Sequence, residues 1–261
     1  MILAQYTASM AAHGPPARIR LSADAIRPVA QGHPWVYKDG ISGELPPPGT
    51  PVQLVDGRDK IVGFGLTDVG PIAIRVLDRH GAAIPRLIHH RIQAAAALRA
   101  RVLPLNTSAY RLVNAAGDGL PGLVVDRYGP AAVLRLYGAC WEPWLNSLTY
   151  ELSKLPGVET VYRRLGVRRV DGDEGLERLQ GPDQPEPLVV TEAGLRFLVR
   201  PSVGQKTGLF LDQREHRRRV AELSRDTDVI NLFAYTGGFS VHAAAAGARR
   251  VTTVDIAAPA L

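Results

Sequence analysis

The stretch that decides the fold is NLFAYTGGFS, residues 231–240. It begins within the apolar run DVINLF (228–233) and is followed by a second strand-like run, RRVTTVD (249–255). An apolar run of strand length that leads into two glycines and then into SVHAAAAGA (240–248) predicts a strand, a tight turn and a helix. The second apolar run completes a βαβ unit. Fully apolar strands are typical of a covered parallel sheet, so residues 201–261 are predicted to belong to an α/β domain.

The glycine turn and the acid that ends the second strand point to a nucleoside ligand. In open parallel sheets, ligands bind at the carboxyl ends of the strands, where glycines let the backbone come close. Asp255 stands 18 residues after Gly237, and its carboxylate could accept hydrogen bonds from both ribose hydroxyls. The turn lacks the G-x-G-x-x-G pattern that holds a pyrophosphate. An adenosine with an amino-acid tail, S-adenosylmethionine, is therefore favoured, and a tight turn without a ligand is the alternative.

A second polar segment, GQKTGLFLDQREHRRR (204–219), precedes the βαβ unit. Its loop carries Gln205 and Lys206, and an amphipathic helix is predicted over residues 213–224. Asp212 lies at the start of this helix, where a plain N-cap role is the alternative to ligand binding. The helix would present a basic face made of Arg214, Arg217, Arg218 and Arg219. Ordinary solvated charge is the alternative reading of this face.

Two further domains are predicted upstream. Residues 18–92 alternate in polarity between Gly/Pro turns, as in a small β barrel or sandwich. The Ala-rich residues 89–101 are expected to form a helix that leaves it. Residues 93–200 are predicted to form an α+β domain of order β-β-α-β-β, which ends in a hairpin around residues 192–194.

Composition limits the partners and the chemistry. The chain of 261 residues has a net charge of +6 and a pI of about 9.7, which favours a nucleic-acid partner. Since few of the basic residues are lysines, a general bias toward arginine is the alternative. Cys140 is the single cysteine, so neither a disulfide nor a cysteine-based zinc site is expected, and no metal is predicted. The sequence predicts neither a signal peptide nor a membrane span, hence a cytoplasmic protein.

Residues 204–255 closely resemble the large-subunit ribosomal RNA cytosine carbon-5 methyltransferases that carry an N-terminal PUA domain. The resemblance extends to GHPWVY (32–37), which is similar to the PUA opening of that family. It also includes NAAGDGLPGLVVDRYG (114–129), which resembles the start of its central domain. The implied fold is a PUA-like β barrel (18–92), an α+β domain (93–200) and the N-terminal part of a Rossmann-like methyltransferase domain (201–261).

The resemblance implies S-adenosylmethionine as cofactor and large-subunit ribosomal RNA as partner, and a homodimer is compatible with it. Asp255 would bind the ribose and Ile256 would pack against the adenine. The methionine side would be lined by Asn231, Phe233, Tyr235, Thr236 and Gly237. The implied cofactor-binding residues are Gln205, Lys206, Thr207, Gly208, Phe210, Asp212, Arg214, Asn231, Phe233, Tyr235, Thr236, Gly237, Asp255 and Ile256. The implied RNA contacts are His33, Trp35, Arg217 and Arg218. For His33 and Trp35 the alternative is a structural role in the core and in a turn.

The sequence departs from the family pattern at its C-terminal end. Methylation at carbon 5 of cytosine needs a thiolate that adds to carbon 6, and neither an Asp-Pro-Pro loop nor a nucleophilic cysteine follows residue 255. Cys140 is predicted to be structural. We therefore expect a C-terminally truncated enzyme that is inactive alone. The alternatives are a non-catalytic RNA-binding module, built from the PUA-like and central domains, and a DNA or protein methyltransferase with an unrelated appendage.

Overall fold

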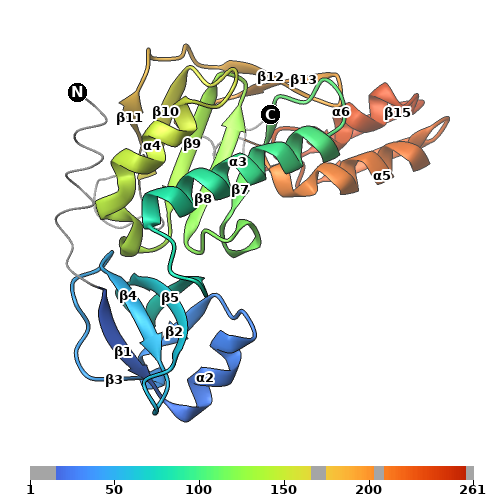
Figure 1. Cartoon of the computed structure of the whole chain (residues 1–261). Helices are drawn as coiled ribbons and strands as arrows, with labels where there is room; N and C mark the ends of the chain where they lie inside the picture. Colours follow the sequence, from blue (N-terminus) through green and yellow to red (C-terminus); the bar gives the residue numbers. More distant parts are fainter. Residues whose placement is uncertain (1–15, 166–174, 203–208, 257–261) are drawn as a thin grey trace. The chain divides into compact units, whose positions relative to one another are not determined.

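The computed structural model describes residues 16–165, 175–202 and 209–256 (Figure 1). The predicted ligand residues Gln205 to Gly208 lie outside these ranges. The contacts divide the chain into two compact units. Unit 1 contains residues 1–99, 113–125 and 134–156, and unit 2 contains residues 100–112, 126–133 and 157–261.

The N-terminal domain, in unit 1, is a nearly closed barrel of mixed sheet, which confirms the predicted PUA-like fold. Its strand order is β2-β6-β5-β4-β1-β3. The strands are β1 (Ala17–Leu21), β2 (Trp35–Tyr37), β3 (Ile41–Ser42), β4 (Pro51–Val55), β5 (Ile61–Thr67) and β6 (Ile72–Asp78). The helix α2 (Ala23–Ala30) packs against the sheet and adds Val29 to the core of Leu21, Leu54 and Ile74.

The long helix α3 (Ile84–Val102) begins earlier than the predicted helix of residues 89–101. Pro85 lies in its first turn, where the missing amide hydrogen costs no helical hydrogen bond. Its buried residues Ile84, Ile88, Ile92 and Ala95 recur every three or four positions, which is the spacing of one helical face.

The central domain contains a five-stranded sheet of order β11-β10-β9-β8-β7. The strands are β7 (Ala109–Asn114), β8 (Leu123–Tyr128), β9 (Ala131–Leu136), β10 (Thr160–Leu165) and β11 (Gly175–Gln180), and α4 (Leu145–Ser153) follows β9 in the chain. The predicted order β-β-α-β-β missed β7 and β11. The residues of β11, GLERLQ, are half-buried or exposed, so this strand has no apolar pattern to reveal it.

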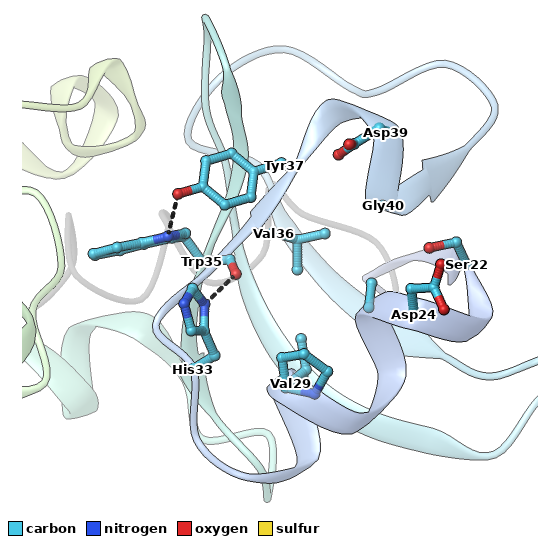
Figure 2. Close-up of a pocket in the computed structure, with 11 residues that line it drawn as sticks. Ser22, Asp24, Val29, His33, Trp35, Val36, Tyr37, Asp39 and Gly40 are labelled. Atoms are coloured by element: carbon cyan, nitrogen blue, oxygen red, sulfur yellow. Dashed lines mark hydrogen bonds between the residues drawn. The ribbon is translucent and has the colours of Figure 1, made fainter.

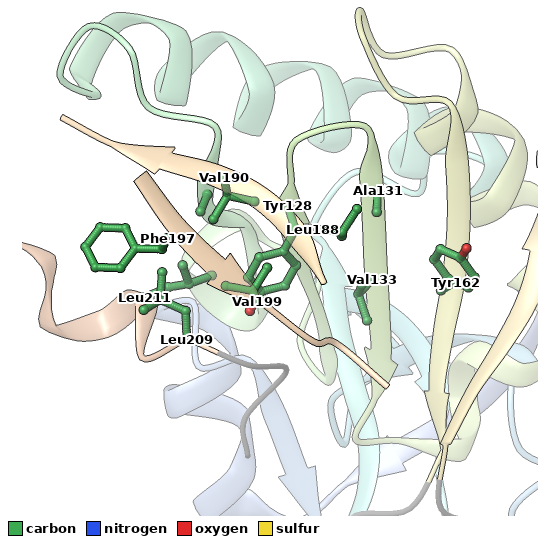
Figure 3. Packing of buried hydrophobic residues seen from close by; sticks show 11 residues of the cluster. Tyr128, Ala131, Val133, Tyr162, Leu188, Val190, Phe197, Val199, Leu209 and Leu211 are labelled. Carbon is green, nitrogen blue, oxygen red and sulfur yellow. The ribbon is translucent and has the colours of Figure 1, made fainter. Parts of the chain in front are cut away.

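The hairpin of β12 (Leu188–Glu192) and β13 (Leu195–Val199) forms where it was predicted. Its turn residues Ala193 and Gly194 have φ angles of 49° and 84°, as tight hairpin turns require. The inward side chains of both strands pack on those residues of the five-stranded sheet that belong to unit 2 (Figure 3). This cluster contains Ala109, Tyr128, Ala131, Val133, Tyr162, Leu188, Val190, Phe197, Val199, Leu209 and Leu211.

The C-terminal segment of unit 2 contains the predicted βαβ unit. The elements are α5 (Arg214–Ser224), β14 (Asp228–Leu232), α6 (Gly238–Ala245) and β15 (Arg250–Val254). The two strands pair in parallel, with Asp228 opposite Arg250 and Leu232 opposite Val254. Within the described residues the sheet has two strands, and Ile230 and Leu232 are 70% and 59% exposed.

Candidate functional site

A pocket of about 350 Å³ opens at the carboxyl ends of β14 and β15, beside the turn that leads into α6. This is the position that the sequence predicts for a ligand in a parallel sheet. The residues that line it are Leu209, Phe210, Gln213, Arg217, Phe233, Ala234, Tyr235, Thr236, Gly238, Phe239 and Asp255.

The turn that forms one wall of the pocket holds three residues in the left-handed backbone region. Phe233, Tyr235 and Gly237 have φ angles of 57°, 50° and 72°. This conformation is costly for the two aromatic residues and natural for glycine. Two hydrogen bonds from β15 and its end hold the turn. The carboxylate of Asp255 accepts a hydrogen bond from the Tyr235 amide at 2.7 Å, and the Val254 carbonyl accepts one from the Ala234 amide at 3.1 Å.

The opposite wall comes from the short 3-10 helix η5 (Leu211–Gln213) and the residues before it. The ring of Phe210 meets that of Tyr235 edge to face, with the centroids 5.1 Å apart. Aromatic rings together with a single carboxylate suit a planar, hydroxyl-bearing ligand such as a nucleoside.

The structure brings five predicted cofactor residues to the pocket wall, namely Phe210, Phe233, Tyr235, Thr236 and Asp255. Gly237 lies within the same turn and supplies its positive φ angle. The sequence did not single out Leu209, Gln213, Ala234, Gly238 and Phe239 as lining residues. For Leu209, Gln213, Ala234 and Gly238 the available signal was adjacency in sequence to residues that were predicted.

Other predicted cofactor residues lie away from the pocket lining. Asn231 donates to the Ser240 hydroxyl at 2.9 Å, and Ser240 contacts Thr253 at 2.7 Å. This polar chain joins β14, α6 and β15, so Asn231 holds the framework behind the turn. Ile256 is 98% exposed. Asp212 and Arg214 are not among the lining residues. The N-cap position of α5 is occupied by Gln213 rather than Asp212, and the Gln213 side chain makes no capping hydrogen bond.

The prediction that Arg217 contacts RNA is wrong. Its side chain is 2% exposed and forms a bidentate ion pair with Glu192, so the guanidinium cannot reach a phosphate at the surface. Arg217 lies on the inward face of α5 with Val220 and Ser224, and this spacing was a signal in the sequence. Arg218 is exposed and pairs with Glu215 and Glu222 on the same helix.

A second pocket, of about 300 Å³, lies in the PUA-like domain between α2 and β2 (Figure 2). His33, Trp35 and Tyr37 form one side of it. The Trp35 carbonyl accepts a hydrogen bond from the His33 ring at 2.9 Å, and the Trp35 indole donates to the Tyr37 hydroxyl at 3.1 Å. Val36 is buried in the core of the domain and also lines the pocket, whereas Tyr37 is 49% exposed.

Cys140 is fully buried in η3 (Ala139–Trp144). Its own amide donates to a carboxylate oxygen of Asp68 at 3.2 Å. Burial, and then the negative charge of Asp68, raise the pKa of the Cys140 thiol well above its usual range. A protonated, inaccessible thiol is a poor nucleophile, so its structural role is as predicted.

The described residues offer neither a metal-binding cluster nor a membrane-spanning helix. Across residues 16–165, 175–202 and 209–256, no group of three His, Cys, Asp or Glu side chains is arranged to hold a metal ion. In the same ranges, no helix is long and apolar enough to cross a membrane.

Comparison with protein families gives two matches. Residues 160–261 match the family model of S-adenosylmethionine-dependent methyltransferases, and residues 19–79 match that of PUA-like domains. The first match agrees with the cofactor predicted from the glycine turn and Asp255.

The similar proteins are named as ribosomal RNA large subunit methyltransferases. The chain is 39% identical over 272 residues to a ribosomal RNA large subunit methyltransferase of Deinococcus radiodurans. It is 33% identical over 255 residues to ribosomal RNA large subunit methyltransferase I of Shewanella denitrificans. These alignments include 96% and 94% of the chain, which spans 65% and 64% of the two relatives.

Solved structures share the fold. A structure from Streptococcus mutans, assigned as a SAM-dependent methyltransferase, superposes with a TM-score of 0.78 at 24% identity, over 94% of this chain and 64% of that one. A methyltransferase structure complexed with SAH (S-adenosylhomocysteine) superposes over the same shares of the two chains with a TM-score of 0.80 at 24% identity.

Proposed function

Since a methyltransferase family matches the residues around the pocket and a PUA-like family matches the N-terminal domain, we propose that this chain carries two parts of one enzyme. These parts are the S-adenosylmethionine site and the RNA-recognition domains of a methyltransferase that acts on large-subunit ribosomal RNA. The single observation that carries the proposal is the pocket at the ends of β14 and β15, which Asp255 and the strained turn line.

The chemistry of this pocket fits an adenosine ligand. Asp255 lies at the end of β15, where its carboxylate would accept ribose hydroxyls. The rings of Phe210 and Tyr235 offer apolar walls to the adenosine and its tail. When bound, S-adenosylmethionine would supply the electrophilic methyl group, and the role of these residues is to bind and orient it.

We further propose that the methyl acceptor is carbon 5 of a cytosine, which the sequence resemblance supports. That reaction needs a cysteine thiolate. The single cysteine of the 261 residues, Cys140, is buried with a raised pKa. These 261 residues alone are therefore proposed to bind the cofactor without transferring its methyl group.

The PUA-like pocket supports RNA recognition. Aromatic side chains at a partly open pocket stack on unpaired bases, and Trp35 and Tyr37 meet this description. The buried thiol also favours the second candidate function, in which these 261 residues act as a non-catalytic RNA-binding module.

Two measurements test the proposal on the full 261-residue chain. Isothermal titration with S-adenosylhomocysteine should show saturable binding at one site, and its absence would refute the cofactor assignment. Incubation with labelled S-adenosylmethionine and unmodified large-subunit RNA should leave the RNA unlabelled. Labelled RNA would contradict the inactivity of the chain and would support the enzymatic role.

A further inference from the structure

A buried cluster of charged side chains lies directly behind the cofactor pocket and joins three elements of unit 2. Glu192, at the end of β12, is fully buried. Its two carboxylate oxygens accept hydrogen bonds from the Arg217 guanidinium at 2.7 and 2.6 Å. His242 of α6 places its Nε2 atom 3.3 Å from the same carboxylate. Buried charges are costly unless they are paired and hydrogen-bonded, so the cluster requires an explanation.

The cluster reaches the pocket through Arg217, which lies on its wall. A third nitrogen of this guanidinium donates to the Phe210 carbonyl at 2.9 Å, and Phe210 is the residue whose ring meets Tyr235. The stem of Arg217 also packs on the glycine turn, because a Cβ atom on Gly238 would lie 3.1 Å from its Cδ atom. One side chain therefore fixes both walls of the pocket.

His242 links the cluster to α6 and to the glycine turn. The Nδ1 atom lies 2.9 Å from the Gly238 carbonyl, and the Nε2 atom lies 3.3 Å from the Glu192 carboxylate. The imidazole ring stacks on Phe197 of β13 with the centroids 5.8 Å apart. Its ionisable neighbours in these contacts are Glu192 directly and Arg217 through the shared carboxylate.

Glu192 is carried on a rigid support. The neighbouring Ala193 amide donates to the Thr107 hydroxyl at 3.0 Å, and the Gly194 amide donates to the Asn106 carbonyl at 3.0 Å. The amide of the adjacent Thr191 donates a hydrogen bond to the Ser108 hydroxyl. A carboxylate held in this way can position the groups that bind it.

We propose that Glu192 is a positioning residue for the cofactor pocket, which acts from the β12–β13 hairpin through Arg217 on Phe210 and through His242 on Gly238. The inference rests on the proposed function, because its effect is measured as cofactor affinity. A role confined to stability would leave the affinity of the folded protein unchanged.

The test uses S-adenosylhomocysteine titrations of the full chain. Glu192→Gln keeps the shape of the side chain and removes its charge, and it should weaken binding about tenfold in protein that is still folded. The matched control is Glu222→Gln. Glu222 lies on α5, the helix that carries Arg217, and pairs with Arg218 and Arg219 on the exposed face of that helix. This control should bind as the wild type does.

A second variant keeps the proposal falsifiable if Glu192→Gln fails to fold. Arg217→Lys retains a charge for Glu192 but loses the bidentate geometry, and it should also weaken binding. Unchanged affinity in a folded Glu192→Gln or Arg217→Lys protein would overturn the proposal. Failure of the wild type to bind would instead refute the cofactor site itself.

Discussion

The carboxylate of Asp255 has two roles in the proposed cofactor site, and one substitution removes both. It holds the strained turn by accepting a hydrogen bond from the Tyr235 amide at 2.7 Å, and we propose that it also accepts hydrogen bonds from the ribose hydroxyls. Hydrogen bonds to charged groups contribute about 1.5–3 kcal/mol. We therefore expect Asp255→Ala to weaken S-adenosylhomocysteine binding by about 10- to 100-fold, as measured by isothermal titration.

The chain offers a matched control at the opposite end of the same strand pair. Asp228 begins β14, and its ion pair with Arg249 is exposed to solvent. Exposed pairs of this kind contribute little, so Asp228→Ala should leave the affinity within about twofold of the wild type. Equal losses in both variants would show that Asp255 acts only through the general stability of the βαβ unit.

The thiol of Cys140 provides a second prediction at the scale of one residue. Because burial and the charge of Asp68 raise its pKa, the thiol stays protonated at pH 8 in the folded protein. Native protein should therefore react with a disulfide reagent only as fast as it unfolds, whereas guanidinium-denatured protein should react at once. Rapid native labelling at pH 8 would contradict the burial and reopen a nucleophilic role for Cys140.

The sequence was informative for residues whose role follows from local order. Asp255 and Gly237 could be predicted because a parallel strand must end in a turn at the ligand edge. Glu192 could not, because its partners Arg217 and His242 are 25 and 50 residues away in the chain. A carboxylate beside a hairpin turn gives no sign that a distant helix will bury it.

At the scale of one element, the glycine turn before α6 must keep its left-handed backbone. Gly237 has a φ angle of 72°, and a Cβ atom there would meet its nearest side-chain atoms only at 3.9 Å. Gly237→Ala therefore adds backbone strain without a clash. We expect a loss of about 1–2 kcal/mol in the free energy of unfolding, together with weaker S-adenosylhomocysteine binding.

Gly247 provides the comparison within the same βαβ unit. It follows α6 with a φ angle of 92°, and a Cβ atom added there would meet nothing within 4 Å. Gly247→Ala should lower thermal stability to a similar degree and leave the affinity for S-adenosylhomocysteine unchanged. If both variants lost affinity equally, the turn at Gly237 would have no specific role in binding.

The elements that sequence reasoning found are those with a strong local signal. Apolar residues recur at helical spacing in α4 and alternate in the β12–β13 hairpin. The βαβ unit was instead recognised by its apolar strand and the glycine turn that follows it. The helix α2 escaped prediction because it has only eight residues and contains Pro28, which removes a helical hydrogen bond. Its stability comes instead from packing against the barrel, through Ala25, Ile26 and Val29, and tertiary packing cannot be read from a short segment.

At the scale of the whole molecule, the net charge of +6 and the aromatic pocket of the PUA-like domain should contribute differently to RNA binding. Phosphate contacts release counterions, so each one steepens the dependence of affinity on salt. Base stacking on an aromatic ring does not. For a single-stranded fragment of large-subunit RNA, raising NaCl from about 50 to 200 mM should weaken binding roughly tenfold.

Two variants separate these contributions in fluorescence anisotropy titrations. Trp35→Ala removes a stacking surface and should weaken binding by about 1–3 kcal/mol without a change in the salt slope. Arg218→Ala should lower the slope by less than about 0.7, because Arg218 already shares its charge with Glu215 and Glu222. Unchanged affinity in Trp35→Ala would exclude this pocket as the place where RNA bases bind. A flat salt response would show that the positive charge reflects the arginine-rich composition and plays no part in recognising RNA.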